Sequence, residues 1–266
     1  MQFDFGQNWK NFSKNALTDE KVARAREDFI NLLEGIEIKN KTFLDIGFGQ
    51  GLPLLISKDL GAISVGNDIN PKCAEVLAEN KRFFKNLQGS DIPAIVGSIL
   101  ENSTLDEIKK YSGNDEGKFD IVYSWGVLHH TGNMKLAINN AASLVKNNGH
   151  FIISIYNRHW TSAFWKGVKW TSCISPVFVK KLMVKMFYPV IWTGAYFTMS
   201  ENPAKSEVRG MDFYYDVVDW VGGYPFEYAS IKELKKMMWE MGFDCLKAIP
   251  TKGLTGCNEL VFKKTN

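Results

Sequence analysis

The sequence of 266 residues lacks acidic residues over a long internal stretch. No Asp or Glu occurs in the eighty residues between Asp120 and Glu201, although the chain has 29 acidic and 32 basic residues in all. This acid-free segment contains eight Lys and Arg residues, which leaves −5 on the rest of a chain whose net charge is +3. All four histidines also lie within it. We interpret the segment either as a solvated face or as part of a site or surface that receives an anionic molecule.

Cysteine is scarce, and its spacing excludes two kinds of site. The four cysteines form no C-x-x-C pair and have no metal-ligand spacing with histidine. Neither a zinc site nor a dithiol redox motif is indicated, so we expect no metal. Isolated thiols of this kind are typical of proteins in a reducing compartment.

Long apolar runs are absent as well. The longest uncharged apolar stretch, residues 186–200, is interrupted by Pro189 and Gly194 and is short for crossing a bilayer. The N-terminal residues include Asp4 and have no apolar region of the kind that a signal peptide needs. These absences predict a cytoplasmic protein. The length and the 45% hydrophobic content fit one large domain or one domain with an insertion.

Strand and helix patterns alternate along most of the chain. A predicted helix capped by Thr18 precedes the first strand, and a helical pattern separates each strand from the next. The predicted strands are residues 42–46, 63–68, 92–96, 119–124 and 150–156. Such alternation predicts right-handed crossovers and an α/β fold with a mostly parallel, doubly wound sheet.

The alternation stops between Asn157 and Ala229, in a segment rich in Trp and Tyr. It resumes with a helix at 231–241, a strand at 243–249 and a final run at 259–262. An insertion after the fifth strand is expected above the crevice where doubly wound sheets bind ligands. We interpret it either as a substrate cap or as a helical pair that extends the core.

Three glycines follow the first strand at alternate positions. Gly47, Gly49 and Gly51 stand where the backbone must turn tightly and approach a ligand. Asp68 ends the next strand, where a carboxylate is placed to bind a ribose diol. The spacing is not the G-x-G-x-x-G that seats a pyrophosphate, and Asp45 would repel that group but attract an amine. The pattern therefore favours S-adenosylmethionine, which carries an ammonium and a sulfonium, over NAD.

The runs 43–51, 66–69 and 119–130 together resemble the motifs of class I S-adenosylmethionine-dependent methyltransferases. The resemblance implies a Rossmann-like, seven-stranded doubly wound sheet whose last strand is antiparallel. Phe5–Trp9 resembles the aromatic entry segment that folds over the cofactor, with an aromatic staple on the core as the alternative for Trp9. The implied cofactor-binding residues are Trp9, Asp45, Gly47, Gly49, Gly51, Asp68, Ile69, Ser98, Ile99, Ser124 and Trp125. Ser98 stands where family members often place an acidic residue for the adenine amino group.

On the same resemblance, the chain divides into four parts. A cofactor-covering segment is expected at 1–40 and a methyltransferase core at 41–156. A substrate cap follows at 157–229, and the C-terminal part of the core is expected at 230–266.

Candidate catalytic groups follow the fourth and fifth strands. A hydroxyl or ammonium acceptor needs a base, and His129 and His130 lie at the predicted rim of the crevice, although the family often uses this pair structurally. Tyr156 and Arg158 follow the fifth strand. Arg158 is suited to clamp a phosphate or carboxylate, with an ordinary surface arginine as the alternative.

Residues 209–227 combine acids, aromatics and a Gly-Gly-Tyr-Pro turn. Here Arg209, Tyr214 and Asp219 are the predicted acceptor-binding residues, and Asp216 is a further catalytic candidate. Together with residues 256–259, this segment resembles bacterial methyltransferases associated with capsule or surface polysaccharide and with small-metabolite pathways.

We therefore predict methyl transfer from S-adenosylmethionine to an O or N nucleophile of a small anionic acceptor, phosphorylated or carboxylated and in some cases sugar-linked. We expect a monomer or homodimer. No nucleic-acid partner is expected, because no Asn-Pro-Pro-Tyr tetrad follows the fourth strand. The alternatives are an RNA or protein methyltransferase and an NAD-dependent oxidoreductase. A third is a non-catalytic cofactor-binding or membrane-surface protein that uses residues 160–197 as a basic and aromatic face.

Overall fold

The fold is described from a computed structural model, which covers residues 3–199, 211–251 and 256–265. In these ranges seven strands form one sheet in the order β3-β2-β1-β4-β5-β7-β6. Strands β1 to β5 pair in parallel, and β7 runs antiparallel to both of its neighbours. The predicted Rossmann-like, seven-stranded sheet is thus confirmed. The strands are β1 (Thr42–Ile46), β2 (Ile63–Asp68), β3 (Ala94–Val96), β4 (Phe119–Trp125), β5 (Val145–Tyr156), β6 (Phe243–Ile249) and β7 (Cys257–Lys264).

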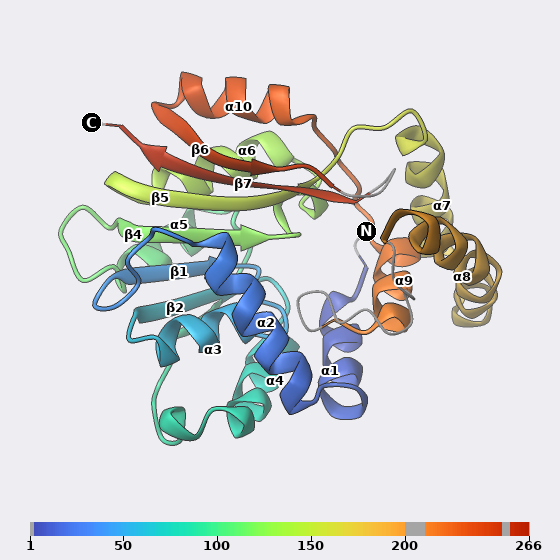
Figure 1. Cartoon of the computed structure of the whole chain (residues 1–266), viewed down its shortest axis with the longest axis horizontal. Helices are drawn as coiled ribbons and strands as arrows, with labels where there is room; N and C mark the ends of the chain where they lie inside the picture. Colours follow the sequence, from blue (N-terminus) through green and yellow to red (C-terminus); the bar gives the residue numbers. More distant parts are fainter. Residues whose placement is uncertain (1–2, 200–210, 252–255, 266) are drawn as a thin grey trace.

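Helices cover both faces of this sheet (Figure 1). They are α1 (Phe5–Asn15), α2 (Asp19–Leu32), α3 (Leu52–Asp59), α4 (Lys72–Asn80), α5 (Asn102–Lys109), α6 (Met134–Ser143), α7 (Ser162–Ile174), α8 (Val177–Met199), α9 (Phe213–Gly222) and α10 (Ile231–Glu240). Alternate side chains of one strand reach opposite faces, so that Leu44 and Phe43 belong to two separate hydrophobic clusters. Each cluster therefore binds one helical layer to the sheet.

Several element boundaries differ from the prediction. The sequence pattern at 73–86 predicts one continuous helix, but α4 ends at Asn80. Two short 3-10 turns follow, and Phe84 between them lies outside the helical region at φ −121° and ψ 88°. Strand β5 begins at Val145, earlier than expected, because Val145 pairs with Phe119 before an irregularity that precedes the pairing of Ile121 with His150. The N-terminal part forms two helices, and the first, α1, was expected only as an aromatic entry segment.

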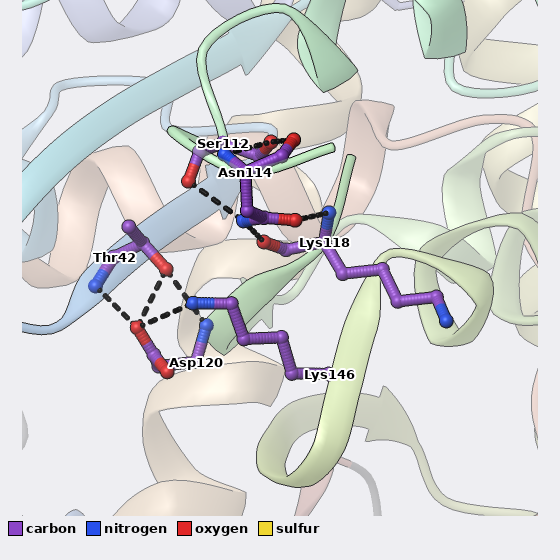
Figure 2. Close-up of polar contacts among 6 residues, drawn as sticks. All are labelled: Thr42, Ser112, Asn114, Lys118, Asp120 and Lys146. Carbon is purple, nitrogen blue, oxygen red and sulfur yellow. Dashed lines mark hydrogen bonds and ion pairs between the residues drawn. The ribbon is translucent and has the colours of Figure 1, made fainter. Parts of the chain in front are cut away.

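A polar network joins three strands at the edge where they begin (Figure 2). One carboxylate oxygen of Asp120 on β4 accepts hydrogen bonds from the Thr42 amide (2.8 Å), the Thr42 hydroxyl (2.7 Å) and the Lys146 ammonium (3.1 Å). These donors outweigh partial burial and lower the pKa of Asp120. The network fastens β1, β4 and β5 at the end of the sheet opposite to the carboxyl ends of the strands.

The insertion after β5 forms the helices α7, α8 and α9, which lie beside the carboxyl ends of the strands (Figure 1). We call these three helices the cap. Their small hydrophobic core contains Val184 of α8 and Val217 and Val221 of α9. In the described part of the chain, no helix has the length and apolarity that a transmembrane span requires.

Candidate active site

A cavity of about 1440 Å³ lies between the sheet, α1 and the cap. Its walls include the glycine loop after β1, the ends of β2, β4 and β5, and residues from α1, α7, α8 and α9. This is the crevice at the carboxyl ends of parallel strands where doubly wound sheets bind ligands. The cavity therefore lies at the crevice where the sequence predicts the site.

The glycine loop leaves no room for side chains. Gly47 (φ +73°) and Gly49 (φ +54°) adopt left-handed backbone conformations that L residues rarely take. A Cβ atom on Gly49 would lie 2.8 Å from the indole nitrogen of Trp9, and one on Gly47 would lie 2.3 Å from Val127. Both glycines line the cavity. The backbone of the loop after β1 can thus approach a ligand closely, as the sequence pattern indicates.

Two buried carboxylates stand beside this loop. The two oxygens of Asp68 accept hydrogen bonds from the amides of Gly49 (3.0 Å) and Asn70 (2.8 Å), which fix the carboxylate at the end of β2. Burial raises the pKa of Asp68. Asp45 is 2% exposed and lines the same part of the cavity. These groups can accept ribose hydroxyls and attract an ammonium or sulfonium, so they fit S-adenosylmethionine and not a pyrophosphate.

The other predicted cofactor-binding residues divide into two groups. Trp9, Ile69, Ser98, Ile99 and Trp125 line the cavity. Two others stand behind its wall: Ser124 donates its hydroxyl to the carbonyl of Ile46 (2.9 Å), and Gly51 begins α3 against Leu77. These two shape the loop without reaching the cavity.

Helix α1 covers the cofactor end of the cavity and is held at both sides. The Asn8 amide donates to Asp219 of α9 (2.8 Å) and to the carbonyl of Tyr215 (3.2 Å). On its other side, Lys10 pairs with Glu75 of α4 (2.7 Å). Sequence reasoning did not identify Asn8, because a lone asparagine in an amphipathic helix carries no pattern.

Acidic side chains of the cap also line the cavity. Asp216 and Asp219 of α9 line it together with Tyr156 and His130. Asp216 lines the cavity with an exposed side chain. Desolvation by the surrounding protein raises the pKa of Asp216 to about 6 and also raises that of Asp219. Asp216 thus changes protonation near neutral pH.

A buried lysine stands behind these acids. Lys169 of α7 is fully buried, and its ammonium donates to the carbonyl of Trp220 and lies 4.3 Å from the centre of that indole ring. The rings of Phe226 (4.8 Å) and Tyr156 (5.3 Å) complete the cage. Burial lowers the pKa of Lys169 to about 7. The sequence showed this residue only as one charge among eight.

The two histidines have different surroundings. His130 lines the cavity, and its Nδ1 donates to the carbonyl of Pro225 (2.6 Å), because a carbonyl oxygen can only accept. Burial lowers its pKa to about 3. His129 is fully buried outside the lining, and its Nδ1 accepts the Tyr156 amide (3.3 Å). Only His130 is therefore placed to face a ligand.

Several predicted acceptor residues lie elsewhere. Arg158 donates to both oxygens of Glu233 (3.0 and 2.8 Å) on the surface, and Tyr214 is 52% exposed; neither lines the cavity. Arg209 lies outside the described residues. Among the cavity residues that the structure describes, none is one of the eight basic residues of the acid-free segment. The basic side chains of the acid-free segment therefore lie outside the cavity lining.

Comparison with known proteins gives one family match and several relatives. A family model described as a methyltransferase domain matches residues 18–248. The chain is 26% identical over 160 residues to the ubiquinone biosynthesis O-methyltransferase of Coxiella burnetii, a match that covers 59% of this chain and 60% of that protein. The chain thus matches less than two thirds of the length of this curated relative.

Solved structures share the fold at low identity. An O-methyltransferase family protein from Burkholderia thailandensis has a TM-score of 0.57 and 13% identity, with 97% of this chain and 60% of that chain covered. Magnesium protoporphyrin IX methyltransferase from Synechocystis, with bound SAH, has a TM-score of 0.55 and 13% identity over 97% and 94% of the two chains. At such identities the likeness is one of fold.

Proposed function

Because the chain belongs to the methyltransferase family whose model matches residues 18–248, we propose that it transfers a methyl group from S-adenosylmethionine to a small molecule. The predicted class, a class I S-adenosylmethionine-dependent methyltransferase, is confirmed by family and fold. S-adenosylmethionine, the predicted cofactor, is the cofactor of this class. The acceptor and the residues that act on it are our proposal.

One observation carries the proposal: a single cavity is lined both by the groups that suit the cofactor and by the candidate groups for the acceptor. Asp45 and Asp68 stand on β1 and β2, and Asp216 and His130 come from α9 and the turn after β4. Pockets for one small ligand usually measure about 300–1,000 Å³. The volume of about 1440 Å³ leaves space for an acceptor beside the cofactor.

Asp216 is our choice for the general base. The bound cofactor supplies a methyl group already activated on a positively charged sulfur, so the protein must align the acceptor and remove its proton. Above a pH of about 6, Asp216 is a carboxylate open to the cavity and can take a proton from a hydroxyl. His130 stays neutral, and because its Nδ1 donates to Pro225, its Nε2 carries no proton and can accept a hydrogen bond from the acceptor.

The charges of the lining guide the choice of acceptor. Asp216 and Asp219 of α9 line the cavity, and the basic residues of the acid-free segment do not. An anionic acceptor, which the sequence predicted, would meet repulsion here. We therefore propose an uncharged, largely apolar acceptor with an aromatic hydroxyl. Apolar walls that include Trp165 and Trp220 support this choice, as does the relative in ubiquinone biosynthesis. The surface-polysaccharide link and the cellular location stay predictions.

The test measures cofactor binding first and turnover second. Titration calorimetry with S-adenosylhomocysteine should show binding that Gly49→Ala abolishes, because the new methyl would meet Trp9. Gly113→Ala is the matched control, since Gly113 has a left-handed conformation (φ +70°) but no neighbour within 4 Å. Absence of binding to the wild type would refute the proposed function.

Turnover with methyl-labelled cofactor is then compared across phenols, phosphorylated sugars, RNA and protein extracts. Label in a phenol supports the proposed acceptor. Label only in phosphorylated sugars would favour the anionic acceptor that the sequence predicted. Label only in RNA or protein would favour an RNA or protein methyltransferase.

A further inference from the structure

The cap exposes a large amount of apolar surface. Large apolar side chains on α7, on α8 and just before them are between 46% and 85% exposed. They are Trp160, Phe164, Trp170, Ile174, Val177, Phe178, Leu182, Met186, Val190, Tyr196 and Phe197. An exposed apolar patch on this scale marks an interaction site. We call residues 160–199, with α7 and α8, the hairpin.

Helix α8 presents this surface as a stripe. Phe178, Leu182 and Met186 follow one another at intervals of four residues, which places them on one face of the helix. Val184 lies on the inner face, where it packs against α9. The helix is thus apolar on both faces, whereas a surface helix normally has a polar outer face. Within the ranges that the structure describes, no other segment covers this outer face.

The charge of the hairpin indicates what the cover is. Residues 160–199 contain five lysines and no Asp or Glu. Lys181 and Lys185 are exposed and precede Leu182 and Met186 of the stripe by one position each. An apolar stripe bordered by lysines is the pattern of helices that lie in the interface of a membrane with anionic lipids.

We propose that the hairpin docks on the surface of an anionic lipid bilayer. The stripe of α8 then enters the boundary between headgroups and acyl chains, and Lys181 and Lys185 contact lipid phosphates. A second copy of this chain suits the face less well. A twofold interface would bring two acid-free, positively charged hairpins together, and like charges in contact repel.

The docking face is continuous with the cavity. Val190, four residues after Met186, is 60% exposed and also lines the cavity, together with Ile191 and Thr198 of α8. A bilayer on this face would therefore lie beside the cavity. The docking proposal does not depend on the acceptor, so its failure would leave the proposed function intact.

Vesicle flotation with the full chain tests the proposal. Vesicles of phosphatidylcholine with phosphatidylglycerol should carry the wild type upward, and added salt should weaken this binding. Phe178→Gln combined with Leu182→Gln, and Lys181→Glu combined with Lys185→Glu, should each weaken partitioning on the order of tenfold or more. The matched controls are Trp239→Gln and Lys236→Glu on α10, where both residues are exposed. Unchanged S-adenosylhomocysteine affinity shows that each variant is folded.

Three results would overturn the proposal. The first is no flotation of the wild type, and the second is equal flotation of the wild type and both hairpin variants. The third comes from sedimentation velocity: if Phe178→Gln with Leu182→Gln turns a dimer into a monomer while flotation stays unchanged, a second copy covers this face.

Discussion

Asp216 is the residue on which the proposed chemistry depends. Asp216→Asn keeps the size of the side chain but removes the proton acceptor, so we expect kcat to fall by about 10²–10⁴-fold. Affinity for S-adenosylhomocysteine should stay unchanged, because the proposed cofactor carboxylates, Asp45 and Asp68, belong to β1 and β2, whereas Asp216 belongs to α9. Steady-state kinetics and calorimetry measure the two effects separately. A variant that turns over like the wild type would exclude Asp216 as the base.

The pH profile gives an independent check of Asp216. Wild-type kcat should fall as the pH drops through about 6, where this carboxylate gains a proton. The Lys169 charge lowers the pKa of Asp216, so Lys169→Met should move the midpoint upward. Lys166→Met, on the exposed side of the same helix, should leave it in place.

Asp216 also links activity to stability. Its pKa is raised by folding, so its contribution to stability is largest at acidic pH and is lost as the pH rises through about 6. Asp216→Asn should therefore raise Tm at neutral pH. The gain should be about 1 kcal/mol or less, because water in the cavity screens the carboxylate.

At the scale of single residues, more of the predicted cofactor-binding residues than of the predicted acceptor-binding residues line the cavity. Asp45, Gly49 and Asp68 occupy fixed positions relative to strands, and strands follow from local pattern. Lys169 and His130 owe their surroundings to chain segments far away, such as the carbonyls of Trp220 and Pro225. No local pattern contains that information.

Among the elements, α1 shows how a short helix gains a role through its contacts. It lies between α4 and α9 and places Trp9 against Gly49. The sequence indicated an entry segment over the cofactor but not the hydrogen bond from Asn8 that joins this helix to the cap. That bond spans more than two hundred residues of sequence.

Asn8→Leu should loosen α1 from α9. The variant removes the donor to Asp219 and leaves that carboxylate without its amide partner, which usually costs about 1–3 kcal/mol. We expect a five- to hundredfold loss of S-adenosylhomocysteine affinity, about 1–3 kcal/mol, because a mobile α1 no longer closes the cofactor end. Lys14→Ala, on the exposed last turn of the same helix, is the control. If calorimetry gives equal affinity for both variants, α1 does not act as a clamp.

For the molecule as a whole, the two ends of the sheet have separate tasks. The carboxyl ends of the strands hold the cavity, and the Asp120 network fastens the opposite end. The alternation of strands and helices made this division predictable. The positions of the charged side chains in the cap could not be predicted, because the sequence does not show which side of a helix faces the cavity.

Asp120→Asn tests that division. It weakens three hydrogen bonds at the far end, so the free energy of unfolding should fall by about 1–3 kcal/mol. Folding lowers the pKa of Asp120, so its contribution is present above the unfolded pKa and is lost as the pH falls through the folded pKa. Chemical denaturation measures the loss, and kcat/KM should stay at the wild-type value. A large fall in kcat/KM at full saturation with cofactor would show that the two ends are coupled.

The composition of the hairpin has one more consequence. Residues 160–199 contain neither a carboxylate nor an imidazole, so mild acidification leaves the charge of their outer surface unchanged. The cavity behaves differently, because Asp216 gains a proton as the pH falls through about 6. Acidity would then stop turnover without releasing the protein from a bilayer: enzyme held on vesicles at low pH should resume methylation as soon as the pH is restored, with no delay for rebinding.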